Sequence, residues 1–147
     1  MRHCILLPLL IPLAPVVLSP SEDAVKKDLA SFQGAWQAVA IQRTDGQPAP
    51  ADEVQNTRLR VEGARFTLTG KTFSISGTFT IDPTRAPKTI DVALDGSGKD
   101  QTKLLGIYRI EGDTRTSRFA LPNNARPVDF GPAREGTVGF TWKRQSP

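Results

Sequence analysis

Histidine, cysteine and methionine are almost missing from this chain of 147 residues. Each occurs once, and all three stand within the first four positions, as Met1, His3 and Cys4. If the N-terminal segment is removed, the rest of the chain has neither an imidazole nor a thiol. This composition argues against a Ser-His-Asp or Cys-His nucleophile, a zinc site and a disulfide. We therefore predict a protein without enzyme activity, and we assign no residue to catalysis, cofactor binding or metal binding.

Residues 1–21 have the order of a secretory signal peptide. Arg2 places a positive charge at the N-terminus, an uncharged apolar run covers Cys4–Leu18, and small residues follow up to Ser21. The apolar run is shorter than the ~20 residues of a transmembrane helix and contains prolines, which favours a cleaved signal over an anchor. We predict cleavage within Ala14–Ala24, near Ser21, and hence an exported protein, periplasmic or extracellular. An uncleaved N-terminal anchor is the alternative.

Residues 22–147 suit a single domain with one hydrophobic core. The net charge of the whole chain is +4, and the basic residues are scattered. Arg58 and Arg60 alternate with Leu59 and Val61, which places both arginines on the solvent face of a strand. A nucleic-acid surface would need clustered basic residues interleaved with exposed aromatic rings. We expect no nucleic-acid partner and no stable membrane span after cleavage.

Helical periodicity is confined to one segment, predicted from Glu22 to about Ser31 with Ser21 as its N-cap. Apolar and polar residues then alternate with period two, which is typical of strands. The clearest alternation, over residues 72–81, predicts an inward face formed by Phe73, Ile75, Phe79 and Ile81. Eight strands are predicted in all, over residues 35–43, 57–62, 65–69, 72–81, 89–94, 103–111, 114–120 and 136–143. Short strands joined by turns favour a meander that closes into a barrel.

Several segments resemble a family of small, uncharacterised exported domains, frequent in planctomycete genomes and lipocalin-like in appearance. The matching segments keep their order along the chain: residues 32–36, 77–83, 87–91, 105–113 and 126–130. The block that begins Gly-Thr at position 77 and ends Ile-Asp at position 91 is the specific part. Members often carry a cysteine where Thr116-Ser117-Arg118 stands here. The resemblance implies a lipocalin-like domain and no assigned catalysis. Together with the residue pattern, it predicts an all-β fold, an antiparallel lipocalin-like barrel of about eight strands with a short N-terminal helix.

The segment Gly34-Ala35-Trp36 also resembles the opening signature of lipocalins. There the tryptophan closes one end of the barrel and packs beneath a basic residue of the last strand. By this resemblance, Lys143 or Arg144 would make a cation–π contact with Trp36. We interpret the cluster as structural.

Three further groups of residues invite a functional interpretation, and each has a simpler one. Asp95, Ser97 and Asp100 could offer oxygens to calcium, but they lack the EF-hand spacing, so a hairpin loop is favoured. Asp82 and Asp91 could act as paired carboxylates, yet each fits an ordinary turn or strand pattern. The sole tyrosine, Tyr108, is predicted to be a core residue whose hydroxyl is satisfied at an edge.

Two functions remain open at this point. In the first, the barrel holds a small apolar ligand. In the second, the core is filled and the domain contacts a cell-surface partner through its loops. The interior volume distinguishes them, because aromatic residues could fill so short a barrel: Trp36, Phe66, Phe73, Phe79, Phe119, Phe140 and Trp142. A ligand cavity should approach the ~300 Å³ lower range of known pockets.

Overall fold

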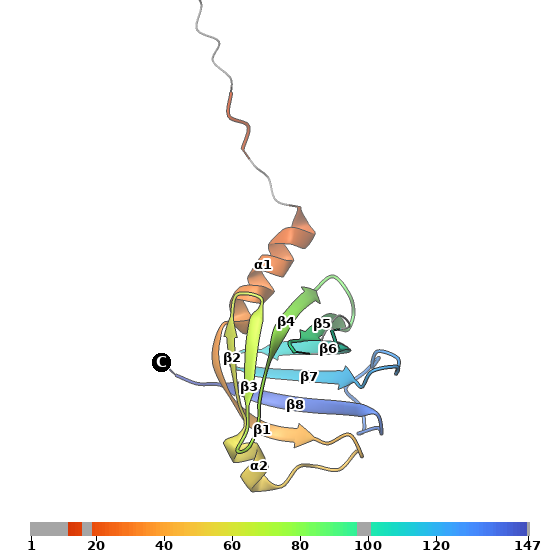
Figure 1. Ribbon diagram of the computed structural model, residues 1–147. Coiled ribbons are helices and arrows are strands. Elements are labelled where there is room, and N and C mark those ends of the chain that lie inside the picture. The colour runs from red at the N-terminus through yellow and green to blue at the C-terminus, as the bar shows by residue number, and fades with distance from the viewer. Residues whose placement is uncertain (1–11, 16–18, 97–100, 147) are drawn as a thin grey trace, which may run out of the picture.

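The structure is a computed structural model that describes residues 12–15, 19–96 and 101–146. Within these ranges it contains two helices and eight strands (Figure 1). The helices are α1 (Pro20–Phe32) and α2 (Ala51–Asn56). The strands are β1 (Gly34–Gln42), β2 (Arg58–Glu62), β3 (Arg65–Thr69), β4 (Ser74–Asp82), β5 (Lys88–Leu94), β6 (Lys103–Glu111), β7 (Thr114–Ala120) and β8 (Thr137–Arg144).

The strands form one closed antiparallel barrel in the order of the sequence. Each strand pairs with the next, and β1 pairs with β8 to close the ring. The predicted fold class is therefore confirmed. Strands β3, β6 and β7 lie at their predicted bounds, and the other five differ by no more than two residues. The alternation of apolar and polar residues was sufficient to predict the strands, because most strands have one buried face and one solvated face.

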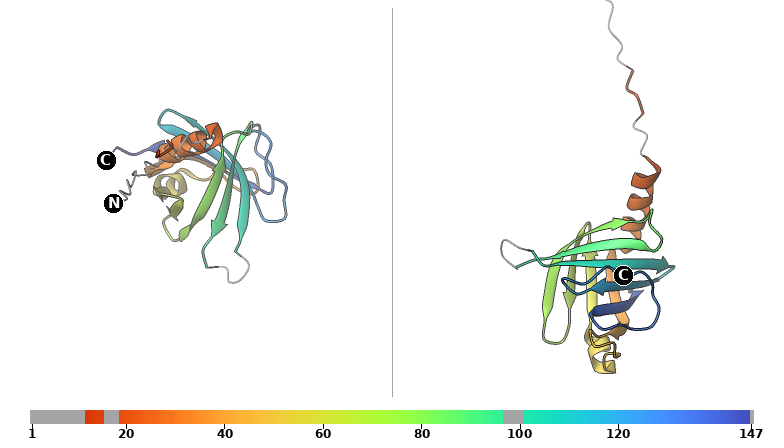
Figure 2. Two further views of the ribbon diagram at one scale, coloured as in Figure 1. Left: turned by 90° about the horizontal axis from the view of Figure 1, so that it is seen from above. Right: turned by 90° about the vertical axis from the view of Figure 1, so that its right-hand side faces the viewer.

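The two ends of the barrel differ in how the strands are joined. At one end, two-residue turns join β2 to β3 and β6 to β7, with Gly63 and Gly112 at positive φ. At the other end, the connections over residues 43–57 and 121–136 are long. Helix α1 lies at the end with the tight turns and α2 at the end with the long connections (Figure 2). We call these the closed end and the open end.

Helix α1 begins earlier than the sequence analysis predicted. Ser19 is its N-cap and accepts a hydrogen bond from the backbone N–H of Glu22, so the assignment of Ser21 as the cap was wrong. Pro20 suits the first turn, because its fixed φ is helical and the backbone N–H that it lacks would have no partner there. The helix spans the predicted signal boundary at Ser21. The rest of the predicted signal lies largely outside the described residues, which omit 1–11 and 16–18.

Strand β4 turns its apolar side chains inward over most of its length. Phe79 is 5% exposed, whereas Thr80 on the other face is exposed. Phe73 is an exception to the predicted face, because it precedes the strand and is 42% exposed. Its ring lies over Gly70 in the turn between β3 and β4, where a Cβ atom would clash with it. The turn, not the strand pleat, sets the direction of this ring.

Helix α1 is anchored to the barrel through a buried polar group. Asp28 accepts hydrogen bonds from the Tyr108 hydroxyl and from the Lys88 ammonium, both at 2.8 Å. Tyr108 is 1% exposed, so it is the predicted core residue with a satisfied hydroxyl. At the end of the helix, the Phe32 ring packs on Phe79 with ring centroids 5.3 Å apart. Within the described ranges, no helix is long and apolar enough to cross a membrane.

Candidate functional site

Trp36 closes the barrel at the α1 end. Its side chain is fully buried, and its indole N–H donates to the Phe32 carbonyl at 2.9 Å. The Arg144 guanidinium lies over the indole, 4.3 Å from the ring centroid. Arg144 also donates to the carbonyls of Gln33 at 2.7 Å and Ser31 at 2.5 Å. The predicted cation–π contact is therefore present, and Arg144 makes it.

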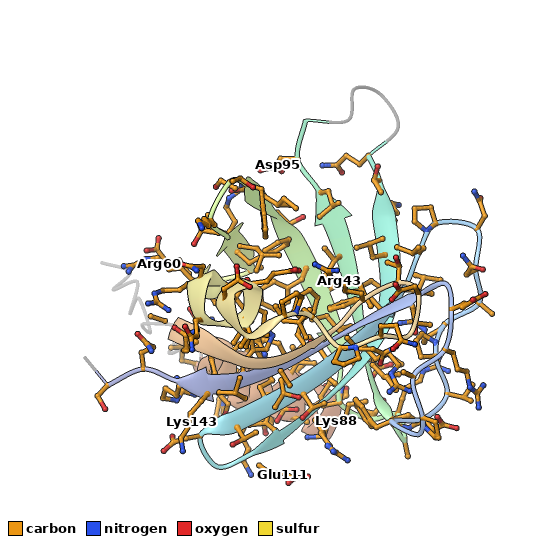
Figure 3. All side chains as sticks on the ribbon, turned by 90° about the horizontal axis from the view of Figure 1, so that it is seen from below. Arg43, Arg60, Lys88, Asp95, Glu111 and Lys143 are labelled. Carbon is orange, nitrogen blue, oxygen red and sulfur yellow. The ribbon has the colours of Figure 1, made fainter. Side chains whose placement is uncertain are left out.

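Lys143, the other candidate for that contact, lies on the opposite face of β8. Side chains alternate between the two faces of a strand, so only one of two consecutive residues can face inward. Lys143 is exposed and lies at the periphery of the barrel, as Arg60 and Glu111 do (Figure 3).

A cavity of about 210 Å³ occupies the interior of the barrel above this closed end. All but two of its lining residues are apolar, and the two exceptions are Arg115 and Ser117 on β7. Of the seven aromatic residues that could have filled the barrel, Trp36 lies outside the lining and Phe73 lies at the open end. The other five line the cavity without filling it: Phe66, Phe79, Phe119, Phe140 and Trp142.

Two glycines make room for the aromatic rings of this lining. A Cβ atom on Gly106 would lie 2.5 Å from the Phe119 ring, and a Cβ atom on Gly77 would lie 2.9 Å from the Phe66 ring. Each ring therefore lies close against a glycine of the neighbouring strand, and a larger residue at either position would displace the ring.

Toward the open end, the cavity adjoins a second space. A second hollow of about 320 Å³ lies between the cavity and α2, and it is lined partly by Arg43, Glu53 and Phe73. Four residues line both spaces, so the two spaces adjoin each other: Leu68, Ile75, Val138 and Phe140. Arg43 and Glu53 form an ion pair at this opening, which we call the mouth. We call the cavity and the adjoining hollow together the channel, whose inner part is apolar and whose mouth is polar.

Arg115 lies at the deep end of the channel. It is 5% exposed, and its guanidinium lies 4.4 Å from the Phe32 ring centroid and 5.0 Å from that of Trp36. Among the described residues, its Nε and Nη1 atoms are buried and have no hydrogen-bond partner. Burial, together with the like charge of Arg144, lowers the pKa of Arg115 to about 9. The group therefore still carries its charge at neutral pH.

The strand register defines the depth of each side chain in the channel. Strand β7 starts at the closed end, where Arg115 pairs with Trp142 of β8. Ser117 pairs with Phe140 and Phe119 pairs with Val138. From the closed end to the mouth, the inward residues of β7 are therefore Arg115, Ser117 and Phe119, which present a cation, a hydroxyl and an aromatic ring in that order.

The other candidates from the sequence lie outside this site. Asp82 bonds to the Thr84 hydroxyl and amide, which lower its pKa, and Asp91 pairs with Arg126 at 2.6 Å. Asp95 pairs with Arg65 at 2.5 Å, while Ser97 and Asp100 lie outside the described residues. In the described part of the chain, no group of three or more metal-ligating side chains occurs.

Sequence reasoning missed Arg115. Both faces of β7 carry polar residues, since Thr114, Thr116 and Arg118 alternate with Arg115 and Ser117. Alternation alone therefore does not say which face is buried. Arg118 is also shielded from solvent, but the connection 121–136 covers it, and it donates to the carbonyls of Asp129 and Gly131. Phe119 lies on the same face of the strand as Arg115, and it was the one residue of β7 that indicated that this face points inward.

No family model, no curated protein and no solved structure matches this chain.

Proposed function

We propose that this chain is an exported, non-catalytic binding domain that holds a small apolar ligand inside its barrel. The observation that carries the proposal is the apolar cavity of about 210 Å³, which adjoins the hollow at the mouth. Apolar walls with a few polar groups are typical of small-molecule sites. Burial of an apolar ligand there would contribute roughly 25 cal/mol for each Å² removed from water.

The volume restricts the size of the ligand. The cavity volume is smaller than the ~300 Å³ at the lower end of known ligand pockets. A ligand must therefore be small or slender, or it must extend past Leu68 and Phe140 into the mouth. A single alkyl chain meets this requirement better than a fused ring system does.

Export and family membership belong to the same proposal. The order of charge, apolar run and small residues in positions 1–21 supports export to the periplasm or the cell exterior. The meander order of eight strands is that of up-and-down barrels such as lipocalins, which supports the resemblance to lipocalin-like exported domains. The mass of the protein recovered from its native cell tests the export directly, because an intact N-terminus on a cytoplasmic protein would contradict it.

Binding of a neutral fluorescent probe to two matched variants tests the ligand site. N-phenyl-1-naphthylamine should bind the wild-type chain with a rise in probe fluorescence. Leu104 lines the cavity, whereas its neighbour Leu105 is 37% exposed on the outer face of β6. Leu104→Trp should fill the cavity and abolish binding, and Leu105→Trp should leave it unchanged. Thermal unfolding of both variants controls for overpacking, which typically costs about 1–3 kcal/mol.

The small volume also favours a second candidate, a domain with a filled core that acts through its surface. Absence of probe binding to the wild-type chain, together with an extract free of co-purifying small molecules, would support that candidate. Equal binding to both tryptophan variants would place the probe on the surface and would also contradict an interior site.

A further inference from the structure

The barrel interior holds a charge that no neighbour within the described ranges neutralises. Arg115 is 5% exposed, and the charged group that affects its pKa is Arg144, which has the same sign. Its contacts with Phe32 and Trp36 are cation–π contacts. Such contacts are weaker than the penalty for burying an unpaired ion, so the rings offset only part of that penalty.

Arg144 provides a comparison within the same fold, because its terminal guanidinium nitrogens have hydrogen-bond partners. It lies over the same indole ring, yet its two terminal nitrogens donate to backbone carbonyls, and its Nε lies 3.6 Å from Asp113. Arg118, on the same strand as Arg115, is likewise bonded to carbonyls. Arg115 is different because its side chain lines the cavity while two of its donors have no partner among the described residues. A polar group buried without a partner calls for a specific explanation.

We propose that Arg115 binds the carboxylate of a single-chain amphiphile, whose apolar tail extends through the channel toward the mouth. This inference rests on the proposed function and adds the chemical class and the orientation of the ligand. A carboxylate supplies the missing charge and accepts hydrogen bonds from the guanidinium. Ser117 lies two residues further along the same face of β7 and offers a hydroxyl beside the first part of the tail.

The energetics favour an anion over a neutral head group. Arg115 is already desolvated in the folded chain, so ligand binding has to remove water only from the carboxylate. The usual objection to buried ion pairs, that both partners must be desolvated, therefore applies to one partner only. A neutral hydroxyl in the same position would leave the charge of Arg115 uncompensated, and an ammonium would be repelled by it.

Three ligands with the same tail test this inference: octanoate, 1-octanol and octylamine. The full chain should bind octanoate at least tenfold more tightly than 1-octanol, and octylamine most weakly, as measured by displacement of N-phenyl-1-naphthylamine at neutral pH. Arg115→Met keeps the length and removes the charge. It should lose the preference for octanoate while it still binds 1-octanol. Arg60→Met, an exposed arginine on the outer face of β2, should behave as the wild type does.

The outcomes separate this inference from the proposed function. Equal binding of octanoate and 1-octanol by the wild type would refute the role of Arg115 and leave a neutral ligand site in place. Failure of all three ligands and of the probe would refute both. A preference for octanoate that persists in Arg115→Met would place the carboxylate elsewhere. If Arg115→Met does not fold, Arg115→Lys keeps a charge and should still prefer octanoate to octylamine.

Discussion

Individual residues in this barrel differ in how completely their polar groups are satisfied. The two arginines at the closed end illustrate the range. Arg144 combines an aromatic contact with hydrogen bonds to the carbonyls of Ser31 and Gln33, so it links the end of α1 to the last strand. Arg115 has the aromatic contacts but lacks partners for two nitrogens within the described residues. The first arrangement serves stability, and the second suits binding.

Replacement of Arg144 should therefore destabilise the fold. Arg144→Met removes the cation–π contact and leaves the Ser31 and Gln33 carbonyls without their donors, at an expected cost of about 1–3 kcal/mol in the free energy of unfolding. Lys143→Met, one residue earlier and exposed, should change it by less than about 0.5 kcal/mol. Urea denaturation of the two variants measures the difference. Equal urea midpoints for the two variants would show that Arg144 does not stabilise the closed end.

Arg115→Met should show the opposite behaviour in the absence of ligand. It removes an uncompensated buried charge and keeps an apolar side chain of similar length, so we expect unchanged or increased stability. A loss of more than about 2 kcal/mol would indicate that the cation–π contacts with Phe32 and Trp36 are the main purpose of Arg115. The same urea denaturation experiment distinguishes the two results.

Tyr108 makes stability depend on alkaline pH. Burial, followed by the hydrogen bond to Asp28, raises the pKa of Tyr108 above its ordinary value of 10.0. Below pH 10 the phenol is protonated in both the folded and the unfolded states. Above pH 10 it ionises only in the unfolded chain, so the contribution of Tyr108 to the free energy of unfolding falls as the pH rises, while the lowered pKa of Arg115 contributes with the opposite sign. The slope from this group is at most about 1.4 kcal/mol per pH unit.

Because Tyr108 is the only tyrosine, its ionisation can be followed by absorbance alone. We expect the phenolate band to appear together with unfolding, not before it. Tyr108→Phe should show a shallower loss of stability above pH 10 than the wild type does. A phenolate band at pH 10 in a chain that is still folded would contradict the buried hydrogen bond to Asp28.

At the scale of single elements, the strands were more predictable than their neighbours in the chain. Strand β4 has clear alternation, and Phe79 and Thr80 lie on the predicted faces. Phe73 was misassigned because it belongs to a turn, where the pleat of the strand no longer fixes the direction of a side chain. The first helix was predicted, but its cap was displaced by two residues. Both errors lie at element ends, where local hydrogen bonds decide the geometry.

The inward face of β4 predicts unequal effects for two neighbouring substitutions. Phe79→Ala removes a buried ring that packs on Phe32, so it should cost about 3–5 kcal/mol. Thr80→Ala on the exposed face should change the free energy of unfolding by less than about 0.5 kcal/mol. Thermal or chemical unfolding of both variants checks this. A similar cost for both would mean that the register of β4 is displaced by one residue.

For the whole molecule, the closed barrel followed from the number and spacing of the strands, whereas the contents of the barrel did not. Whether the aromatic rings fill the interior depends on where each ring lies, and Phe66 and Phe119 approach Gly77 and Gly106 more closely than any larger residue would allow. The position of Arg115 beside the cavity depends on the pairing of β7 with β8, which cannot be predicted from the local sequence. Sequence reasoning could therefore reach the architecture and the Trp36–Arg144 closure, but not the channel.

The position of a bound ligand tests the central claim most directly. Nuclear Overhauser contacts between octanoate and the full chain would locate both ends of the ligand. We predict contacts from the methylene beside the carboxylate to the rings of Phe32 and Trp142, and from the terminal methyl group to Ile75 and Val138 at the mouth. Contacts with outward residues such as Leu105 and Val128, or the reverse orientation in the channel, would contradict the binding of an anionic head group by Arg115.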